Sequence, residues 1–597
     1  MSRWLTRWGK SIRRFDVLAT LVIALVVLVS YYRALNIGFY GDDWIFYQLA
    51  GRLSLPEYLT KYFDPRAQTA WYRPVQGILF RIEYVLFDGN TVAYHWRNIL
   101  LHLANCFWVW AIVQRVARHR KFALLAAMLF ATLPLGAQAV FWPGVVDPLE
   151  AFFYLASVFF WLGYLQSLRT RDYTLAFVAF LLALFSKEIG VTLPMVLFLI
   201  DRCVVAQPAS LRNLVQRYLG FVLVWLVYLP IEYLAISRSV FITREGYSPT
   251  PNILSNLFDY LAALALPWLF VPLANHLWLI IIGIGLIFLM VWQKKIFLLP
   301  MLAGAVLVIL PVTPFPFVAH RFLYIASVVP AILYGALLTY FESRSRVLVL
   351  VMLSSAILFG GWRIANDAND FGEWARVARV PFRNVSQAHP TFAQDTYLYF
   401  IAPPIPSTNL AGMFFWRYGT QVSVGATDSG QPARLRDHAT TFVYIFDEQG
   451  NQKELRVEKN IAVRATPTLP TTFGQSIVLE GFELVSDRIK QGDALVMLLY
   501  WRGLNRITED YTVVVQLVDA TERVVASYEK EPRQGKLSTS AWQPGELIID
   551  AIVLPIQSDV LSGTYRLEIG LTDAAKNRLR DQTGQDRIII EPVRVGE

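Results

Sequence analysis

The feature that most constrains this chain is a series of long apolar runs. They recur between residues 17 and 362, and at about 15–22 residues each is long enough for a helix to cross a hydrocarbon core of about 30 Å. A helix satisfies its own backbone hydrogen bonds, as lipid requires. The sequence therefore predicts a polytopic α-helical membrane protein, followed after the last run by a segment of ordinary soluble character.

Composition and charge agree with this class. Of the 597 residues, 55% are hydrophobic and only 17% are charged, whereas a typical soluble domain has about 25% charged residues. The net charge of +9 lies largely in short segments between apolar runs, so we interpret it as a determinant of topology and expect no nucleic-acid partner. Cys106 and Cys203 lie in or at the end of apolar runs, which implies no disulfide framework.

Positive charge indicates the topology. Segment 257–273 is apolar but contains Pro267 and Pro272, so it either spans or lies in the interface. If it does not cross, all basic clusters face the cytoplasm, and about 11 spans place the N-terminus inside and the chain after residue 362 outside. The predicted spans are 17–35, 96–115, 122–140, 150–168, 173–187, 188–203, 216–236, 276–292, 296–311, 322–341 and 346–362. The first run could belong to a signal peptide, but no small-residue cleavage site follows it, which favours a retained helix.

The chain divides into four predicted parts. Residues 1–365 form the transmembrane domain, and 366–394 are an amphipathic linker, with FGEWARVARVPF expected to lie on the membrane surface. From about residue 395 the apolar pattern takes a period of two. This predicts a small β-containing segment at 395–468 and a β-sandwich at 469–597, both extracytoplasmic. Aromatic residues of the tail, such as Trp542, could stack on a sugar but are more often core.

Two adjacent acids follow the first apolar run directly. The stretch GFYGDDWIFYQLA, residues 38–50, contains Asp42 and Asp43, and charge this close to hydrocarbon often marks function. One interpretation is a helix cap, because Asp42 precedes a plausible short helix. The other is a general base at the membrane surface. Neighbouring residues of a helix point about 100° apart, so we do not expect the two acids to share one role.

Several cations return to the same predicted outer face. Arg73 lies in the first outer loop, Lys187 and Glu188 lie in SKEIG between two spans, and His320 and Arg321 lie at the mouth of a later span. Arginine binds phosphate through paired hydrogen bonds. Arg321 is on the side where the positive-inside rule makes arginine less expected, which favours an anionic partner. Alternatively, Arg73 is an interfacial anchor, and Lys187 pairs with Glu188.

A polar stripe lies along one face of a predicted span. In YHWRNILLHLAN the polar side chains recur at i, i+3, i+7 and i+10, namely His95, Asn98, His102 and Asn105. Such residues usually face the bundle interior and hydrogen-bond to other segments, and we favour that role over substrate contact. The candidate supporting residues of a site are His95, His102, Glu188 and Tyr324.

A carboxylate base with phosphate-binding cations at a membrane surface suits transfer from a lipid-linked phosphate donor. At this point residues 1–365 resemble the GT-C glycosyltransferases, which use polyprenyl-phosphate sugars and include the lipid A aminoarabinose transferase. YGDDW stands where that class has its Asp-Asp or Asp-Glu motif. YRPV, HWRNILLHLAN, SKEIG and HRFLYIAS are similar to segments of the branch that includes the TPR-bearing transmembrane O-mannosyltransferases. The tail departs from that branch, with neither TPR repeats nor a MIR-type domain, and resembles C-terminal modules of some bacterial GT-C proteins.

The resemblance implies inverting transfer of a sugar from a polyprenyl-phosphate donor to a hydroxyl acceptor at the outer face of the membrane. Asp42 would be the catalytic carboxylate and Asp43 its support. The implied donor-phosphate contacts are Arg73, Lys187, His320 and Arg321. The acceptor stays open among protein, lipid and glycan. The scheme needs no cofactor and no second acid; no residue spacing calls for a metal, although dependence on a divalent metal stays open. The alternatives are a lipid-linked glycan transporter and a catalytically silent scaffold with a glycan-binding sandwich.

The predicted topology has a direct test. A reporter that is active only in the cytoplasm, fused after residue 597, is expected to be silent, because the odd number of spans places the tail outside. The same reporter in the segment 115–121, which is predicted to be cytoplasmic, serves as the control. Activity of the C-terminal fusion would overturn the topology.

Overall fold

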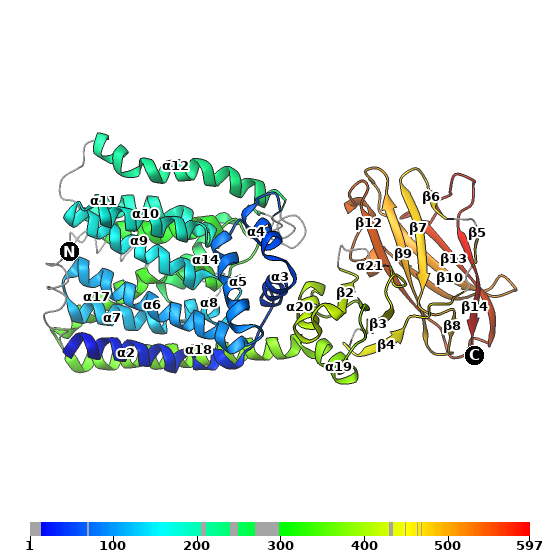
Figure 1. Cartoon of the computed structure of the whole chain (residues 1–597), viewed down its shortest axis with the longest axis horizontal. Helices are drawn as coiled ribbons and strands as arrows, with labels where there is room; N and C mark the ends of the chain where they lie inside the picture. Colours follow the sequence, from blue (N-terminus) through cyan, green and yellow to red (C-terminus); the bar gives the residue numbers. More distant parts are fainter. Residues whose placement is uncertain are drawn as a thin grey trace. The chain divides into compact units, whose positions relative to one another are not determined.

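The computed structural model describes residues 14–67, 71–204, 211–238, 249–268, 298–428, 434–447, 449–461, 464–466 and 469–596. The chain forms two compact units, Met1–Val377 and Ala378–Glu597. The first is helical and the second is built mainly of strands (Figure 1).

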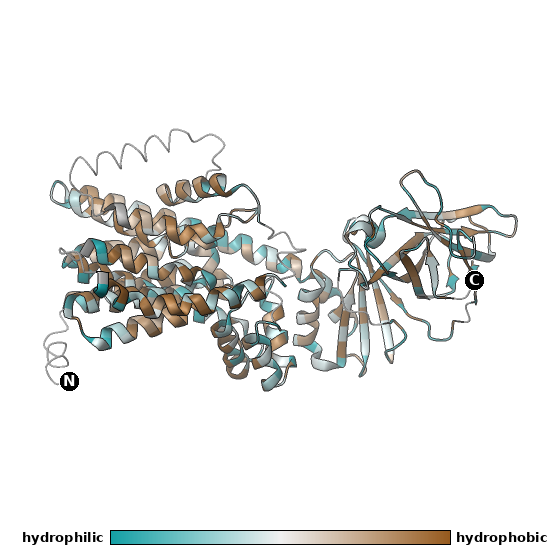
Figure 2. Cartoon of the chain, turned by 90° about the horizontal axis from the view of Figure 1, so that it is seen from above, coloured by the Kyte–Doolittle hydropathy of each residue, from teal (hydrophilic) through white to brown (hydrophobic). Residues whose placement is uncertain are grey.

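The first unit contains long apolar helices that lie side by side (Figures 1 and 2). Among the described residues, five helices are long and apolar enough to cross a membrane, or six if the bent pair formed by α7 and α8 is one span. The five are α2 (Arg14–Tyr31), α6 (Thr91–Ala117), α9 (Asp147–Ser167), α12 (Leu211–Ile236) and α18 (Arg346–Ala378). Large apolar side chains such as Leu21, Leu25 and Leu226 point out of the bundle. Such a surface suits lipid rather than water, and the chain is a multi-pass membrane protein.

The remaining helices of the bundle are shorter. α7 (Arg120–Thr132) is followed by the one-turn segment η2 (Pro134–Gly136) and by α8 (Ala137–Phe141), with a bend of 49° between the two halves. The others are α10 (Thr170–Leu184), α11 (Leu193–Val204), α14 (Ile253–Ala265), α16 (Leu298–Ile309) and α17 (Val328–Glu342). Each predicted span falls on one of these helices except 276–292, which lies outside the described residues. The total of about 11 spans stays a prediction.

The predicted outer loop at 36–95 is itself largely helical. It follows η1 (Tyr32–Asn36) and contains α3 (Asp43–Arg52), α4 (Leu55–Phe63) and α5 (Pro74–Phe87), which lie together at one end of the bundle (Figure 1). Ser54 and Glu57 form a capping box that starts α4. The loop is therefore a compact helical layer that can hold side chains in fixed positions.

The helix at the end of the first unit corrects the predicted linker. The helix of the last predicted span does not end at residue 362, because α18 continues without a break to Ala378. Its Phe371 packs against Tyr40 at 5.4 Å and Phe141 at 6.1 Å between ring centres. The first part of the predicted 366–394 linker thus belongs to the helical unit. Only α19 (Val380–Ala388) follows as a separate helix.

The second unit begins with a small α/β layer. Its sheet has the order β2-β1-β3-β4, with β1 parallel to both β2 and β3. The elements are β1 (Thr396–Ile401), α20 (Ser407–Tyr418), β2 (Val422–Ala426), β3 (Thr440–Phe446) and β4 (Gln452–Arg456). The sequence predicted the strands here, but neither the helix α20 nor the parallel pairing.

A sandwich of two sheets follows. One has the order β11-β10-β13-β14-β5, with β8 also paired to β14, and the other has the order β12-β9-β7-β6. The strands are β5 (Arg464–Thr466), β6 (Thr471–Phe473), β7 (Ile477–Leu484), β8 (Arg488–Ile489), β9 (Ala494–Gly503), β10 (Thr512–Val518), β11 (Val524–Lys530), β12 (Leu547–Pro555), β13 (Gly563–Thr572) and β14 (Ile588–Val595). Trp501 and Trp542 are buried in the core between the sheets, so the interpretation as core is confirmed and sugar stacking on them is wrong.

The α/β layer and the sandwich share a core, which corrects the predicted boundary at residues 468 and 469. Tyr399 and Val443 of the small sheet pack with Leu498 and Ile549 of the sandwich in one buried cluster. In addition, β5 precedes residue 468 yet pairs with β14. A cut at residue 468 would therefore split one folded unit.

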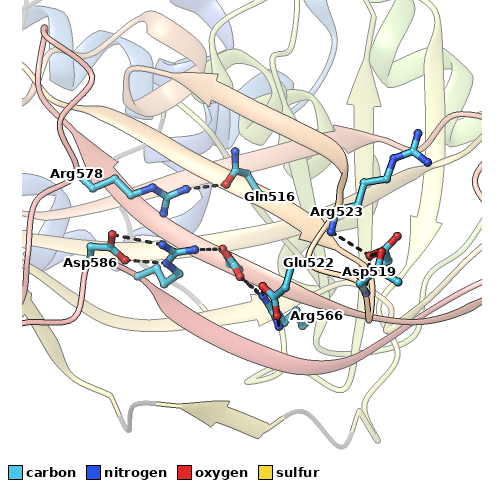
Figure 3. A network of polar contacts seen from close by, with 10 residues as sticks. Gln516, Asp519, Glu522, Arg523, Arg566, Arg578 and Asp586 are labelled. Atoms are coloured by element: carbon cyan, nitrogen blue, oxygen red, sulfur yellow. Dashed lines mark hydrogen bonds and ion pairs between the residues drawn. The ribbon is translucent and has the colours of Figure 1, made fainter.

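The outer face of the larger sheet carries a polar network (Figure 3). The buried carboxylate of Glu568 on β13 accepts hydrogen bonds from Arg566 at 3.0 Å and Arg587 at 2.8 Å. Arg578 donates to the side chain of Gln516 on β10 at 2.6 Å. Because Arg578 and Arg587 lie in the connection between β13 and β14, these bonds hold that connection against the sheet.

One acid inside the sandwich gives a prediction for stability. Asp550 on β12 is fully buried and accepts the backbone N–H of Arg533 at 2.7 Å. Burial raises its pKa to about 7. Its contribution to stability is therefore fully present below the unfolded-state pKa of about 4 and is lost as pH rises through about 7. Asp550→Asn should remove this dependence, which is on the order of a few kcal/mol, and should make the unit more stable than wild type at pH 8.

The measurement is urea unfolding of the second unit within the full-length protein in detergent, followed by pulse proteolysis at several pH values. The matched control is Asp573→Asn, since Asp573 lies in an exposed turn and accepts local hydrogen bonds that lower its pKa. Parallel pH profiles of Asp550→Asn and wild type would contradict the assignment.

Candidate active site

Asp42 and Asp43 have different surroundings at the start of α3. Asp43 is buried, and its carboxylate accepts the backbone N–H of Tyr40 at 2.8 Å and that of Gly144. Asp42 is half-buried, and its side chain makes no capping hydrogen bond. The prediction that the side chain of Asp42 caps the helix is therefore wrong, whereas separate roles for the two acids fit the geometry.

Two glycines allow the loop before α3 to approach the loop after α8. Gly41 has a φ of +53°, and a Cβ there would lie 2.8 Å from the ring of Trp142. A Cβ on Gly144 would lie 2.7 Å from Oδ1 of Asp43. These distances are shorter than carbon atoms tolerate, so the contact between the two loops needs glycine at both positions.

The polar stripe of α6 supports this loop pair. The side-chain amide of Asn98 donates to the carbonyl groups of Ala139, Val140 and Trp142 at 3.0–3.3 Å. His95 bonds to the carbonyl group of Gly38 at 3.0 Å. The interpretation that the stripe faces the bundle interior is thus confirmed. Its donors satisfy backbone carbonyl groups where the chain is not helical, as a membrane protein requires.

The inner half of the stripe binds a different partner. His102 lies 2.6 Å from the hydroxyl of Tyr324, and Asn105 donates to the same hydroxyl at 3.1 Å and to the carbonyl of Pro148 at 2.9 Å. All three side chains are buried. His102 and Tyr324 therefore hold α6 to the segment after Arg321 rather than line an open site.

Two of the predicted cations, Arg73 and Lys187, form ion pairs. The guanidinium of Arg73 forms a fork with Glu188, with N–O distances of 2.7–2.9 Å. Lys187 lies 2.6 Å from Asp147 at the start of α9. The alternative in which Lys187 pairs with Glu188 is wrong. Lys187 pairs with Asp147, 40 residues away in sequence, and Glu188 pairs with Arg73, 115 residues away.

Arg321 shares a ring contact with Lys187 and acts by its charge on Asp42. Its guanidinium carbon is 4.8 Å from the ring centre of Phe322 and 5.4 Å from that of Trp142. The ammonium group of Lys187 is 5.1 Å from the same Phe322 ring. Burial raises the pKa of Asp42 above its ordinary value, while the charges of Arg321 and then Arg73 hold it down. Asp42 is therefore a partly desolvated carboxylate beside two cations.

The structure brings most of the predicted residues together. His320 is adjacent to Arg321, but burial and the charge of Arg363 lower its pKa, which favours the neutral imidazole and weakens the case for phosphate contact. His95 lies beneath the loop that carries the acids. The predicted residues that join this region of the unit are Asp42, Asp43, Arg73, Lys187, Glu188 and Arg321.

Sequence reasoning missed Asp147 and Glu150, and it considered a third acid of this region, Glu232, only as an intramembrane charge for the transporter alternative. Asp147 pairs with Lys187, and Glu150 one turn later is buried with neither carboxylate oxygen hydrogen-bonded to any described residue. Glu232 on α12 accepts the backbone N–H of Tyr72 at 3.2 Å. Asp147 and Glu150 could have been found from the stretch FWPGVVDPLE, because it places two acids at a predicted short turn between apolar runs. Within the described residues, no group of three or more His, Cys, Asp and Glu is arranged to hold a metal ion.

Comparison with known proteins gives three relatives by sequence and several structures. No family model matches the chain. It is 30% identical over 130 residues to protein O-mannosyl-transferase TMTC3 of mouse, which covers 20% of this chain and 14% of that protein. It is 26% identical over 201 residues to Tmtc1 of Drosophila melanogaster, which covers 32% and 23%. The match thus spans less than a quarter of the length of either relative.

Two solved structures are similar at low sequence identity. ArnT from Cupriavidus metallidurans in the apo state matches with a TM-score of 0.48 and 14% identity, over 72% of this chain and 93% of that one. The arabinosyltransferase EmbB from Mycobacterium smegmatis matches with a TM-score of 0.29 and 13% identity, over 99% and 65%. The resemblance to the transmembrane O-mannosyltransferases that the motifs indicated is confirmed by the sequence relatives.

The loop contact gives a prediction for stability. Gly144→Ala should force the Asp43 carboxylate away from the amide it accepts, at a cost of about 1–3 kcal/mol. The matched control is Gly372→Ala in α18, where a Cβ meets no atom within 4 Å and alanine should be neutral or stabilise by up to about 1 kcal/mol. Thermal unfolding in detergent compares the two variants. Equal behaviour would rule out the close approach of Gly144 to Asp43.

Proposed function

We propose that this protein is an inverting glycosyltransferase that moves a sugar from a polyprenyl-phosphate donor to a hydroxyl acceptor at the outer face of the membrane. The observation that carries the proposal is the state of Asp42. Its carboxylate accepts no hydrogen bond from any described residue, yet it lies under the charges of Arg321 and Arg73. An acid that neither caps a helix nor is locked in an ion pair is available for chemistry.

Asp42 suits the role of general base. The acceptor hydroxyl must lose a proton as its oxygen attacks the anomeric carbon, and a positioned carboxylate can take that proton. Burial raises the pKa of Asp42 towards the working pH, which makes it a stronger base, and the two arginines keep it ionised. Asp43 is less suited to this task, because it is buried and each of its carboxylate oxygens already accepts a backbone N–H.

Arg321 suits the leaving group. In the transfer, the C–O bond from the anomeric carbon to the phosphate breaks, and the phosphate keeps the electron pair. At the same time Asp42 gains the proton of the acceptor. One negative charge therefore disappears at Asp42 and one appears on the phosphate. A guanidinium beside the phosphate meets a growing negative charge as the bond breaks, so it stabilises the transition state more than the ground state. Phosphate leaves readily, so no second acid is needed, unlike in glycosidases.

The relatives indicate where a search for substrates should begin. TMTC3 of mouse and Tmtc1 of Drosophila melanogaster are named protein O-mannosyl-transferases. We therefore choose mannose as the first donor sugar and a protein hydroxyl as the first acceptor, with lipid and glycan acceptors next. The class of donor rests on the cations beside Asp42 and on the motif resemblance. No step of the scheme uses a metal.

The proposal includes the topology inferred from charge. The N-terminus lies in the cytoplasm, and the site and the second unit lie outside, with membrane lipid around the helical unit. The second unit takes no part in the chemical step. Because its α/β layer and sandwich share a core, a truncation that tests this should end after α18 rather than at residue 468.

Two rival functions remain testable. A lipid-linked glycan transporter would use charged groups within the spans, but Glu232 and Asp147 both have local structural partners. A silent scaffold would bind glycans without turnover. Release of polyprenyl phosphate from a polyprenyl-phosphate sugar by the purified protein separates the enzyme from both rivals.

The decisive variant is Asp42→Asn. Asparagine keeps the size of the side chain but cannot accept the proton, so turnover should fall about 10²–10⁴-fold while donor binding is retained. Because Asp42 makes no capping bond, stability should change little. Asp43→Asn is the matched control, and its loss of activity should come with reduced thermal stability. Full activity of Asp42→Asn would overturn the assignment of the base.

The pH profile of kcat/KM tests independently whether Asp42 is the base and whether Arg321 lowers its pKa. Activity should rise with pH through the pKa of Asp42, since only the carboxylate form accepts a proton. Arg321 lowers that pKa, so in Arg321→Gln the rising limb should move to higher pH. Arg33→Gln, in a residue that pairs with Asn369, should leave the limb in place. A shift to lower pH in Arg321→Gln would contradict the arrangement.

A further inference from the structure

Two ion pairs lie near the proposed base, and they differ in exposure. In the Lys187–Asp147 pair the side chains are 4% and 2% exposed, whereas in the Arg73–Glu188 pair both are 17% exposed. Protein covers the first pair almost completely, whereas part of the second pair is exposed. Arg73 is also close enough to Asp42 for its charge to lower the pKa of that acid. Of the two pairs, this one is therefore available to a ligand at the site.

The Arg73–Glu188 pair leaves hydrogen-bonding groups unused. Only Nε and Nη2 of the guanidinium reach Glu188, and Nη1 donates to no described residue. Burial acts to raise the pKa of Glu188, but the charges of Arg73 and Lys187 outweigh it and lower the pKa, so the acid is ionised. The pair as a whole is close to neutral, yet it offers N–H donors and carboxylate lone pairs side by side.

The pair is held rigidly from several elements. Glu232 on α12 accepts the backbone N–H of Tyr72, next to Arg73, and the hydroxyl of Tyr228 at 3.1 Å. The ring of Trp71 lies 4.8 Å from the guanidinium carbon. On the other side of Arg73, the N–H of Val75 donates to the carbonyl of Phe185 at 3.1 Å. Such anchoring suits recognition, because a site that is already ordered loses little entropy on binding.

We infer that the Arg73–Glu188 pair recognises the hydroxyl groups of the donor sugar ring rather than the donor phosphate. A phosphate group carries net negative charge and accepts hydrogen bonds without donating any, so a cation already neutralised by a carboxylate binds it poorly. A neutral sugar hydroxyl both donates and accepts, which matches a fork of guanidinium and carboxylate. The inference rests on the proposed function, since it assumes a polyprenyl-phosphate sugar at Asp42.

The experiment separates sugar recognition from phosphate recognition by binding alone, with no turnover. The probes are farnesyl phosphate and its mannosyl, glucosyl and arabinosyl phosphodiesters, measured on the full-length protein in detergent. The sugar-bearing probe that wild type binds best is used for the variants. Arg73→Gln and Glu188→Gln should each weaken it about tenfold or more, while farnesyl phosphate should bind as to wild type. Arg321→Gln should weaken both kinds of probe.

The controls and contrary outcomes are distinct. Glu342→Gln breaks the exposed ion pair with Lys121 and should change neither affinity. If Arg73→Gln weakened the affinity for both probes equally, Arg73 would hold the phosphate. If Arg73→Gln or Glu188→Gln left the affinity for the sugar-bearing probe unchanged, the pair would be only a structural contact. Either result overturns the inference. If wild type bound neither probe, the proposed function itself would fail.

Discussion

The arrangement of the site depends on how the bundle satisfies backbone carbonyl groups where an apolar span is broken. Between α7 and α9 the chain bends, passes through η2 and α8, and continues as a loop from Trp142 to Val146. Carbonyl groups freed at such a break are costly in lipid unless donors reach them. The amide of Asn98 reaches three of them, and Arg97 reaches a fourth, that of Pro143, at 3.0 Å. With this loop fixed, Gly144 can hold Asp43, and Asp147 can hold Lys187.

The buried carboxylate of Asp43 connects this scaffold to the chemistry. It accepts amides from both loops, so it fixes the start of α3 relative to the loop after α8. Because successive helical side chains diverge by about 100°, fixing Asp43 also fixes the direction in which Asp42 points. One acid therefore serves as a structural clamp, and this leaves its neighbour without a capping bond and close to Arg321.

Much of this could be predicted from the sequence, for identifiable reasons. Long apolar runs predict helices directly, because a segment in lipid must form its backbone hydrogen bonds within itself. The helical spacing of His95, Asn98, His102 and Asn105 predicted a face that points into the bundle. The identity of ionic partners could not be predicted, because Arg73 pairs with Glu188 across 115 residues of sequence. Proximity in sequence suggested a pair between Lys187 and Glu188 and a cap from Asp42. In both cases tertiary contacts prevailed over local ones.

The same limit applies to the second unit. Strand periodicity identified the sandwich, but residues 407–418, STNLAGMFFWRY, lack a clear alternation and form α20 between two parallel strands. The predicted boundary at residue 468 failed because the outer face of the β12-β9-β7 sheet is itself apolar and packs on the small sheet. A strand that is buried on both faces reads as a continuous apolar run, as ALVMLLYW does in β9, and such a run indicates a covered sheet without telling which segment covers it.

Charge compensation lowers the cost of gathering several cations at the site. Asp147 and Glu188 neutralise Lys187 and Arg73 at distances of 2.6 and 2.7 Å, so the fields of these cations weaken quickly with distance. Arg321 lowers the pKa of Asp42 more than Arg73 does. Paired cations can be buried near hydrocarbon at a lower cost than isolated ones. The site thus keeps its cations close together, while burial raises the pKa of Asp42 and the charges of Arg321 and Arg73 only partly offset that rise.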